Sequence, residues 1–502
     1  MEPARKPTPI RDIAAFAGLA IVLFGAQFSH DRIVGSDGFF HVAQARRIAA
    51  GDMPWMPLSI FGDGWVDHQL LFHVLLAPLA AALPGVTAAK AGAALFGALG
   101  LFALYGALRR QGAPLPFLFA LAPIAVSWTV LVRFEMPRAQ GLSLALLFAC
   151  IIALLEGRTR LLFALSWIYA WTYQVALLVL PVAILHAVVS RQPVGFERPR
   201  AAWTGPVAAL AGLAAGFVIH PHSPGTLRFL WQHVILKVAN RDALPVGTEW
   251  LDGGLGALVR TGGGGLAMLV VAALLLWRGS SRELPASRAT VFAVLLAAGG
   301  TVGAVLSTKF VEYSVPLSAF ALGMAVRDAR RERGAPGLGV LGLWTAVIAA
   351  GIAWSVHQTT TAVTATEPDP DRLAPAMRWA SEHIEPGERI YHFSWNDWPE
   401  LVFHGPAWEY VVGLDPHFLH LADPELWDLY DKVGQGWGAN PSKPIAERFG
   451  ARWAILVLPY PGDPLTLLGN DPGLRLAWQG RDAVIYEVIH PDATSGRPRG
   501  SP

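Results

Sequence analysis

Residues 88–108 have the sequence AAKAGAALFGALGLFALYGAL, an apolar stretch interrupted by a single charged residue, Lys90, and followed by Arg109 and Arg110. An α-helix rises about 1.5 Å per residue, so about 20 apolar residues cross the roughly 30 Å hydrocarbon layer of a bilayer. This stretch therefore predicts a membrane-spanning helix that ends in a basic loop.

Comparable segments recur up to residue 356, and the sequence beyond it is polar. The candidate spans are 13–29, 88–108, 114–131, 139–156, 161–173, 174–190, 203–220, 257–277, 289–307, 311–326 and 337–356. We therefore expect a polytopic α-helical membrane domain over 1–356 with about eleven spans, an α/β domain over 357–492 and a disordered tail over 493–502. The composition agrees, because only 15% of the residues are charged, against about 25% in soluble proteins.

Basic residues predict the orientation, since Lys and Arg accumulate in short cytoplasmic loops. With the N-terminus in the cytoplasm, every second loop is cytoplasmic. These loops contain Arg109 and Arg110; Arg158 and Arg160; Arg191, Arg198 and Arg200; Arg278, Arg282 and Arg288; and Arg327, Arg330, Arg331 and Arg333. An odd number of spans then puts the C-terminal domain on the outer side.

One apolar segment, 68–83 (HQLLFHVLLAPLAAAL), does not fit this alternation. Counting it as a span would place Arg109 and Arg110 outside and reverse every later loop. Because it is short and carries His68 and His73, we interpret it as an interfacial helix within a long first outer loop, residues 30–87.

Within the C-terminal domain, residues 371–384 have helical spacing, and strand-like runs follow at 389–393, 410–414, 453–458 and 483–489. Alternation of helices and strands favours an α/β domain. The net charge of +2 and the lack of a basic stripe exclude a nucleic-acid partner.

The first candidate site is Gly35-Ser36-Asp37-Gly38-Phe39-Phe40-His41, just beyond the first span. It predicts a helix with Asp37 as N-cap and Gly51 past its end. Asp37 would lie at the positive end of a helix dipole, with His41 one turn further on. Capping alone explains the pattern equally well.

The second candidate is Val132-Arg133-Phe134-Glu135-Met136-Pro137-Arg138, in a short outer loop. Glu135 lies between Arg133 and Arg138, so an arginine could bind phosphate beside an ionised carboxylate. The alternative is that these charges only anchor the ends of the spans.

Three further groups lie on the outer side. His222, in His220-Pro221-His222, is a candidate metal ligand, although a helix-ending His-Pro is the commoner explanation. Glu249 and Trp250 pair an acid with a ring that can stack on a sugar, but Trp is also common at membrane interfaces. Lys309 is placed to meet a lipid phosphate or to pair with Glu312.

In the C-terminal domain, Trp395-Asn396-Asp397-Trp398 suggests a carbohydrate or peptide groove, or alternatively a Trp-rich core with an Asx-turn. Trp395 and Asp397 are the candidate binding residues of this motif.

The order of these motifs resembles the GT-C class of integral-membrane glycosyltransferases, especially oligosaccharyltransferase catalytic subunits, with protein O-mannosyltransferases and lipid A aminoarabinose transferases as relatives. In that class an Asp follows the first span before an aromatic-rich helix, as Asp37-Gly38-Phe39-Phe40-His41 does. A second acidic motif follows the third span, and Arg133-Phe134-Glu135 is similar with one acid instead of two. Trp395-Asn396-Asp397-Trp398 has the position, but not the letters, of the Trp-Trp-Asp-Tyr-Gly motif that recognises acceptor sequons.

The resemblance implies inverting transfer of a sugar from a polyprenyl-phosphate or polyprenyl-diphosphate lipid to an acceptor protein, lipid or glycan, on the outer face of a bacterial inner membrane. In its oligosaccharyltransferase-like version, Asp37 and Glu135 hold Mg²⁺ or Mn²⁺. In its mannosyltransferase-like version, Asp37 is a general base and no metal is needed. The rival functions are a flippase or transporter of lipid-linked glycans and an inactive scaffold with this fold. Transporters place ionisable residues near the membrane midplane, whereas the acids here gather at the outer surface.

Overall fold

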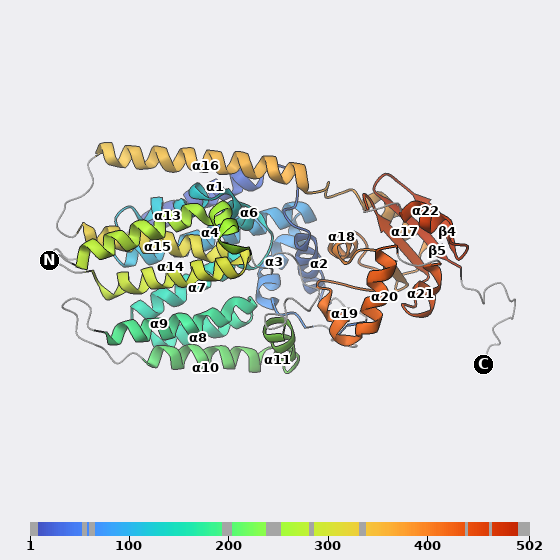
Figure 1. Cartoon of the computed structure of the whole chain (residues 1–502), viewed down its shortest axis with the longest axis horizontal. Coiled ribbons are helices and arrows are strands. Elements are labelled where there is room, and N and C mark those ends of the chain that lie inside the picture. Colours follow the sequence, from blue (N-terminus) through green and yellow to red (C-terminus); the bar gives the residue numbers. More distant parts are fainter. Residues whose placement is uncertain are drawn as a thin grey trace.

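The computed structural model describes residues 9–52, 58–59, 66–192, 203–236, 253–280, 286–330, 338–436, 440–460 and 464–489. Glu249, Trp250 and the tail 493–502 lie outside these residues. Two parts follow one another along the long axis of the molecule, a bundle of long helices and a smaller α/β domain after residue 366 (Figure 1).

The helical part contains every segment that was expected to span the membrane. Its elements are α1 (Pro9–Gln27), α4 (Gly85–Arg110), α5 (Pro116–Val126), α6 (Trp128–Glu135), α7 (Gln140–Leu155), α8 (Thr159–Ala170), η1 (Gln174–Leu178), α9 (Val179–Arg191), α10 (Thr204–Ile219), α13 (Gly254–Ser280), α14 (Arg288–Leu306), α15 (Val311–Ala329) and α16 (Leu338–Thr366). Among the described residues, 6 helices are long and apolar enough to cross a membrane, or 7 with one bent pair. A membrane domain of 6 to 7 spans is thus supported, and the larger number stays a prediction.

The bent pair is α5 and α6, where the sequence predicted one continuous span over 114–131. The two helices meet at 94°. Ser127, between them, has an extended backbone, and its hydroxyl accepts a hydrogen bond from the backbone N–H of Val130 at 3.3 Å. A serine that caps a new helix competes with continuation of the old one, which hydropathy does not register. The chain therefore changes direction shortly before Arg138.

Loops predicted to be cytoplasmic meet at one end of the bundle. Arg110 pairs with Glu156 at 2.9 Å, and Arg327 Nη1 donates to the backbone oxygen of Gln111 at 2.9 Å. Arg109 pairs with Asp12, near the N-terminus. The α/β domain lies at the opposite end of the bundle (Figure 1), as an odd number of crossings requires. Which end faces the cytoplasm stays a prediction.

Short helices separate the bundle from the α/β domain (Figure 1). They are α2 (Asp37–Ala49), α3 (Leu70–Ala82), α11 (Gly225–Phe229) and the π-helix η2 (Leu230–Leu236). Ser36, not Asp37, is the N-cap of α2, and its side chain makes no capping bond. The N-cap prediction for Asp37 is therefore wrong, because the helix begins one residue earlier than expected. Gly51 follows the helix with φ 81°, as predicted.

The α/β domain is built on a five-stranded sheet of order β2-β1-β3-β5-β4. Its strands are β1 (Arg389–His392), β2 (Glu409–Tyr410), β3 (Trp453–Val457), β4 (Leu474–Gln479) and β5 (Ala483–Val488). β1 is parallel to β2 and β3, whereas β5 is antiparallel to β3 and β4. Its helices are α17 (Ala374–His383), η5 (Trp395–Asp397), α18 (Trp398–His404), α19 (His417–Ala422), α20 (Pro424–Gly434), α21 (Ser442–Glu447) and α22 (Pro464–Gly469).

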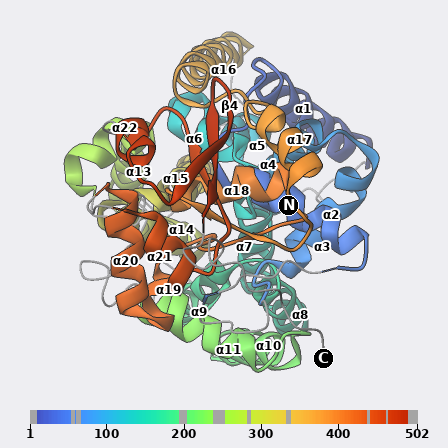
Figure 2. The ribbon, with the colours of Figure 1, turned by 90° about the vertical axis from the view of Figure 1, so that its right-hand side faces the viewer.

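Alternate residues along the strands belong to two apolar clusters, one on each face of the sheet. The cluster that contains Ile390 and Ile455 also contains Phe40 of α2. Phe40 and Trp398 have ring centroids 5.2 Å apart, and Phe39 lies 5.3 Å from Phe403. Viewed along the long axis, the sheet and its helices overlie the end of the bundle (Figure 2). Helix α2 is therefore one element through which the two parts dock.

Candidate active site

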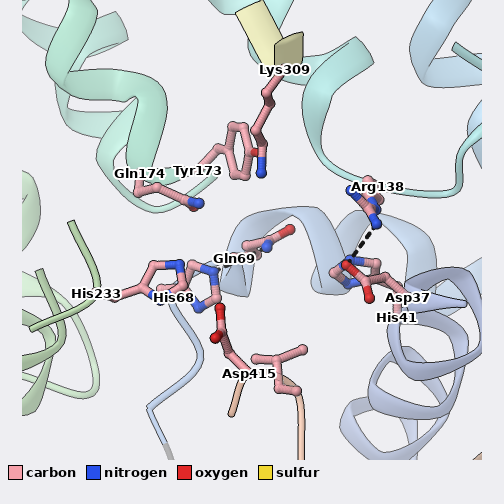
Figure 3. Close-up of a pocket in the computed structure, with 11 residues that line it drawn as sticks. Asp37, His41, His68, Gln69, Arg138, Tyr173, Gln174, His233, Lys309 and Asp415 are labelled. Carbon is pink, nitrogen blue, oxygen red and sulfur yellow. Dashed lines mark hydrogen bonds and ion pairs between the residues drawn. The ribbon is translucent and has the colours of Figure 1, made fainter. Parts of the chain in front are cut away.

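A polar pocket lies where the loops at one end of the bundle meet the α/β domain (Figure 3). It has an empty volume of about 490 Å³, which includes its open mouth. Its lining residues are Asp37, His41, His68, Gln69, Arg138, Tyr173, Gln174, His233, Lys309, Leu414 and Asp415. Segments from across the whole chain thus contribute to one site.

The start of α2 sets the position of Asp37. Gly35 turns the chain with φ 74°, a conformation that costs glycine little. A Cβ on Gly38 would come within 2.7 Å of Ile33 and 2.9 Å of Pro137, so only glycine lets the helix lie against the loop after α6. That close approach brings Asp37 Oδ2 to 3.0 Å from Arg138 Nη2 (Figure 3).

Two basic side chains line the pocket from different elements. Arg138 follows α6, and Lys309 lies in the short 3₁₀ helix η4 (Thr308–Phe310). The ammonium of Lys309 lies 6.0 Å from the ring centroid of Tyr173, on the wall opposite Asp415 (Figure 3). A pocket with two cations and an open mouth suits an anionic group such as a phosphate.

A buried chain of hydrogen bonds runs from the pocket wall into the protein. His41 Nδ1 lies 2.8 Å from His73 Nε2, and His73 Nδ1 lies 2.7 Å from Asp67 Oδ2. Burial lowers the pKa of His41 well below its usual range, and the nearby His73, Arg138 and His68 lower it further. Burial alone would raise the pKa of Asp67, but the charge and hydrogen bond of His73 outweigh it and bring this pKa to about 2. Asp67 is thus ionised and His41 neutral near pH 7.

A second cluster adjoins the pocket at the α/β domain. One ligand atom each from His233, Asp415 and His417 lies within 4.8 Å of the others. Asp415 Oδ1 lies 2.6 Å from His417 Nδ1, and His417 Nε2 lies 3.3 Å from His233 Nδ1. Two imidazoles and a carboxylate are a donor set that transition metals accept. The predicted ligand His222 is not in this group; its backbone N–H donates to His220 Nδ1 at 3.1 Å.

The structure places Asp37, His41, Arg138 and Lys309 together in the pocket, but not Glu135 or Arg133. Glu135 is buried, with Oε2 3.1 Å from His30 Nε2. Arg133 forms an ion pair with the buried carboxylate of Glu312 at 2.8 Å, which joins α6 to α15.

Trp395 and Asp397 belong to η5 in the α/β domain and are not among the pocket's lining residues. Trp395 packs against the apolar cluster on the far face of the sheet. Burial raises the pKa of Asp397 to about 7; Arg372 opposes this rise and Glu400 adds to it.

Several lining residues were not singled out from the sequence, namely Gln69, Tyr173, Gln174, His233 and Leu414. Tyr173 and Gln174 sit at a helix end in an apolar run, where nothing in the sequence distinguishes them.

The arrangement of the helices is that of the GT-C fold of membrane glycosyltransferases. Solved structures show this likeness although no protein-family model and no curated protein sequence matches the chain. At this level of identity the likeness establishes the fold.

ArnT from Cupriavidus metallidurans, solved with undecaprenyl phosphate bound, is 15% identical, with a TM-score of 0.61 over 94% of this chain and 97% of ArnT. The arabinofuranosyltransferase AftD from Mycobacteria is 16% identical, with a TM-score of 0.62 over 96% of this chain, which spans 42% of AftD. The oligosaccharyltransferase AglB from Archaeoglobus fulgidus, in complex with an inhibitory peptide and a dolichol-phosphate, is 11% identical, with a TM-score of 0.55 over 89% of this chain and 69% of AglB.

Proposed function

We propose that this protein is an inverting glycosyltransferase that moves a sugar from a polyprenyl-phosphate or polyprenyl-diphosphate lipid to an acceptor on the outer face of the membrane. The observation that carries the proposal is the pocket itself, where a carboxylate and two cations converge at the ends of the spanning helices. The fold is shared with structures that hold undecaprenyl phosphate or a dolichol-phosphate.

In the proposed reaction, Arg138 and Lys309 bind the donor phosphate at the depth where a lipid headgroup lies. Asp37 accepts the proton of the acceptor's hydroxyl group, and the hydroxyl oxygen attacks the anomeric carbon. The bond from that carbon to the phosphate oxygen breaks, and the phosphate leaves with the electron pair. The two cations stabilise this developing negative charge.

We favour the general-base version over a cation held by Asp37 and Glu135. Asp37 pairs with Arg138, whereas Glu135 contacts His30 and does not line the pocket. Two carboxylates that do not face one point do not fit a shared Mg²⁺ or Mn²⁺, so the proposed reaction does not depend on a metal held by Asp37 and Glu135.

The decisive experiment is Asp37→Asn in the full-length protein, reconstituted in nanodiscs with a panel of polyprenyl-phosphate and polyprenyl-diphosphate sugars. Mass spectrometry of the lipids and products follows transfer. Ser36, not Asp37, is the N-cap of α2, so an amide at position 37 leaves the helix start intact. If Asp37 accepts the proton, kcat should fall by roughly 10²–10⁴-fold.

Asp52→Asn is the matched control. Asp52 follows the other end of α2 and also pairs with an arginine, Arg47, at 2.7 Å, but it does not line the pocket. Its substitution should leave kcat unchanged. If Asp37→Asn turns over as fast as the wild type, the assignment of Asp37 as the general base is refuted. If the wild-type protein moves the lipid-linked sugar across the membrane but transfers no sugar, the flippase is favoured instead.

A further inference from the structure

The buried triad behind the pocket, Asp67, His73 and His41, has a geometry that the proposed reaction does not yet use. The three side chains are 1%, 1% and 2% exposed. Burying a carboxylate and two imidazoles away from water costs free energy, even when they are hydrogen-bonded to one another. We therefore expect these three side chains to serve a function together.

Hydrogen-bond chemistry limits which nitrogens can carry protons. An ionised carboxylate is only an acceptor, so Asp67 Oδ2 must receive the proton on His73 Nδ1. When His73 is neutral and protonated at Nδ1, its Nε2 has a lone pair and accepts from Nδ1–H of His41, 2.8 Å away. By the same rule, His41 Nε2 carries a lone pair.

Asp67 is held in this role by its other contacts. Its Oδ1 accepts the backbone N–H of Gln69 at 2.9 Å, and Oδ2 also receives Gln44 Nε2 at 3.4 Å. Gln44 and His41 lie on the same helix, so α2 and the start of α3 clamp the carboxylate from both sides.

The series of hydrogen bonds from Asp67 through His73 ends at His41, which faces the proposed site of reaction. His41 lines the pocket, and the described residues offer its Nε2 no hydrogen bond. Asp37 and His41 are four residues apart on α2, so their side chains share a helix face, and both are drawn beside Arg138 in Figure 3. The charged and titratable groups around His41 are Asp37 on its own helix, Asp67 and His68 before α3, His73 on α3, and Arg138 after α6.

Resting on the proposed function, we infer that Asp67, His73 and His41 form a proton relay that takes up the acceptor's proton from Asp37. The proton passes from Asp37 to the lone pair of His41 Nε2, which restores the Asp37 carboxylate. As Nδ1–H of His41 moves to His73 Nε2, the positive charge shifts toward Asp67, which stays ionised and stabilises it. The proton leaves later, when the departing phosphate or water accepts it from His41 Nε2 and the relay returns to its starting state.

The first test needs no turnover. In full-length protein labelled with ¹⁵N-histidine, solid-state NMR distinguishes protonated from bare ring nitrogens, and His41→Gln and His73→Gln identify the two signals. The relay requires both rings to be protonated at Nδ1 and bare at Nε2 near pH 7. A His41 protonated at Nε2 would overturn the inference, whatever the protein's activity.

The second test is kinetic. His41→Gln should lower kcat by roughly 10²-fold or more. Asp67→Asn should lower kcat, leave the KM for donor unchanged, and move the acidic limb of the kcat–pH profile to lower pH, because the carboxylate that stabilises the imidazolium is gone. A merely structural triad would raise KM or lower the yield of folded protein without moving that limb.

His186→Gln is the control, since His186 lies on α9 against Phe292, far along the chain from the triad. It should change neither kcat nor the profile. If Asp37→Asn is inactive while His41→Gln and Asp67→Asn keep wild-type kcat and pH profile, the relay is refuted and the transferase stands. If no donor supports transfer by the wild type, the transferase fails, and the relay that rests on it fails as well.

Discussion

Asp397 in the α/β domain makes that domain's stability depend on pH. Its Oδ2 is buried without a hydrogen bond from any described residue. The neighbouring Arg372 directs its fork at Glu400 instead, with Nη2 2.6 Å from Oε2. Burial therefore dominates and raises the pKa of Asp397 from 3.8 to about 7.

The sign follows from proton binding. The folded state binds the Asp397 proton more tightly than the unfolded state, so stability is greatest below pH 3.8 and falls as the pH rises toward 7. At about 1.4 kcal/mol for each pKa unit, the difference amounts to about 4 kcal/mol. Because the residue keeps some contact with solvent, screening reduces the effect, and we expect ~2 kcal/mol, lost as the pH rises from 3.8 toward 7.

Asp397→Asn should remove this dependence, since an amide does not ionise. Hydrogen-exchange mass spectrometry of peptides across 389–404 gives the local unfolding free energy in the full-length protein. The variant should match the wild type below about pH 4 and exceed it by ~2 kcal/mol at pH 8. Asp428→Asn, an exposed carboxylate on α20, is the control and should change little at either pH. A variant no more stable than the wild type at pH 8 would refute the reasoning.

Four further outcomes are expected. Lys309→Ala and Arg138→Ala should each raise the KM for donor lipid by the equivalent of about 1.5–3 kcal/mol, the worth of one charge-assisted hydrogen bond; unchanged donor kinetics in both would make these residues membrane anchors only. Arg133→Ala leaves Glu312 buried and unpaired, and thermal unfolding should show a loss of about 3–5 kcal/mol, with recovery in Arg133→Ala/Glu312→Gln; equal loss in the double variant would contradict this. EDTA should leave transfer unchanged, whereas inhibition that Mn²⁺ reverses would restore the metal mechanism. Reporter fusions at residues 330 and 365 should report opposite compartments, and the same signal from both would refute the predicted topology.

The helical framework was predictable because a bilayer imposes a minimum length of apolar residues. The expected helix near 371–384 and the strand-like runs near β1, β3 and β5 also have counterparts. The break at Ser127 was not predictable, since a capping hydroxyl hardly changes hydropathy. Strand β4 was missed because it is an edge strand without a buried residue, held by pairing with β5 rather than by its own apolar pattern.

The candidate site likewise contains residues that the sequence could predict and residues that it could not. Asp37 and His41 are four residues apart, so local helical spacing predicted that they face one point. Arg133 was assigned to phosphate, but its partner Glu312 lies 179 residues further along the chain. The contact between His41 and His73 spans 32 residues. Partners at such distances are set by packing, which a single sequence does not disclose.

Helix α2 carries Asp37 and His41 and also presents Phe39 and Phe40 to Phe403 and Trp398 of the α/β domain. The α/β domain therefore packs partly on a helix that lies more than 300 residues before it in the sequence, so no single division of the sequence separates the two parts. In a chimera that takes its C-terminal domain from another transferase, the host's α2 would meet foreign aromatic side chains and shift, and the reacting groups would shift with it. Grafting α2 together with the new domain, as one module drawn from two distant stretches of chain, is the exchange that should preserve turnover.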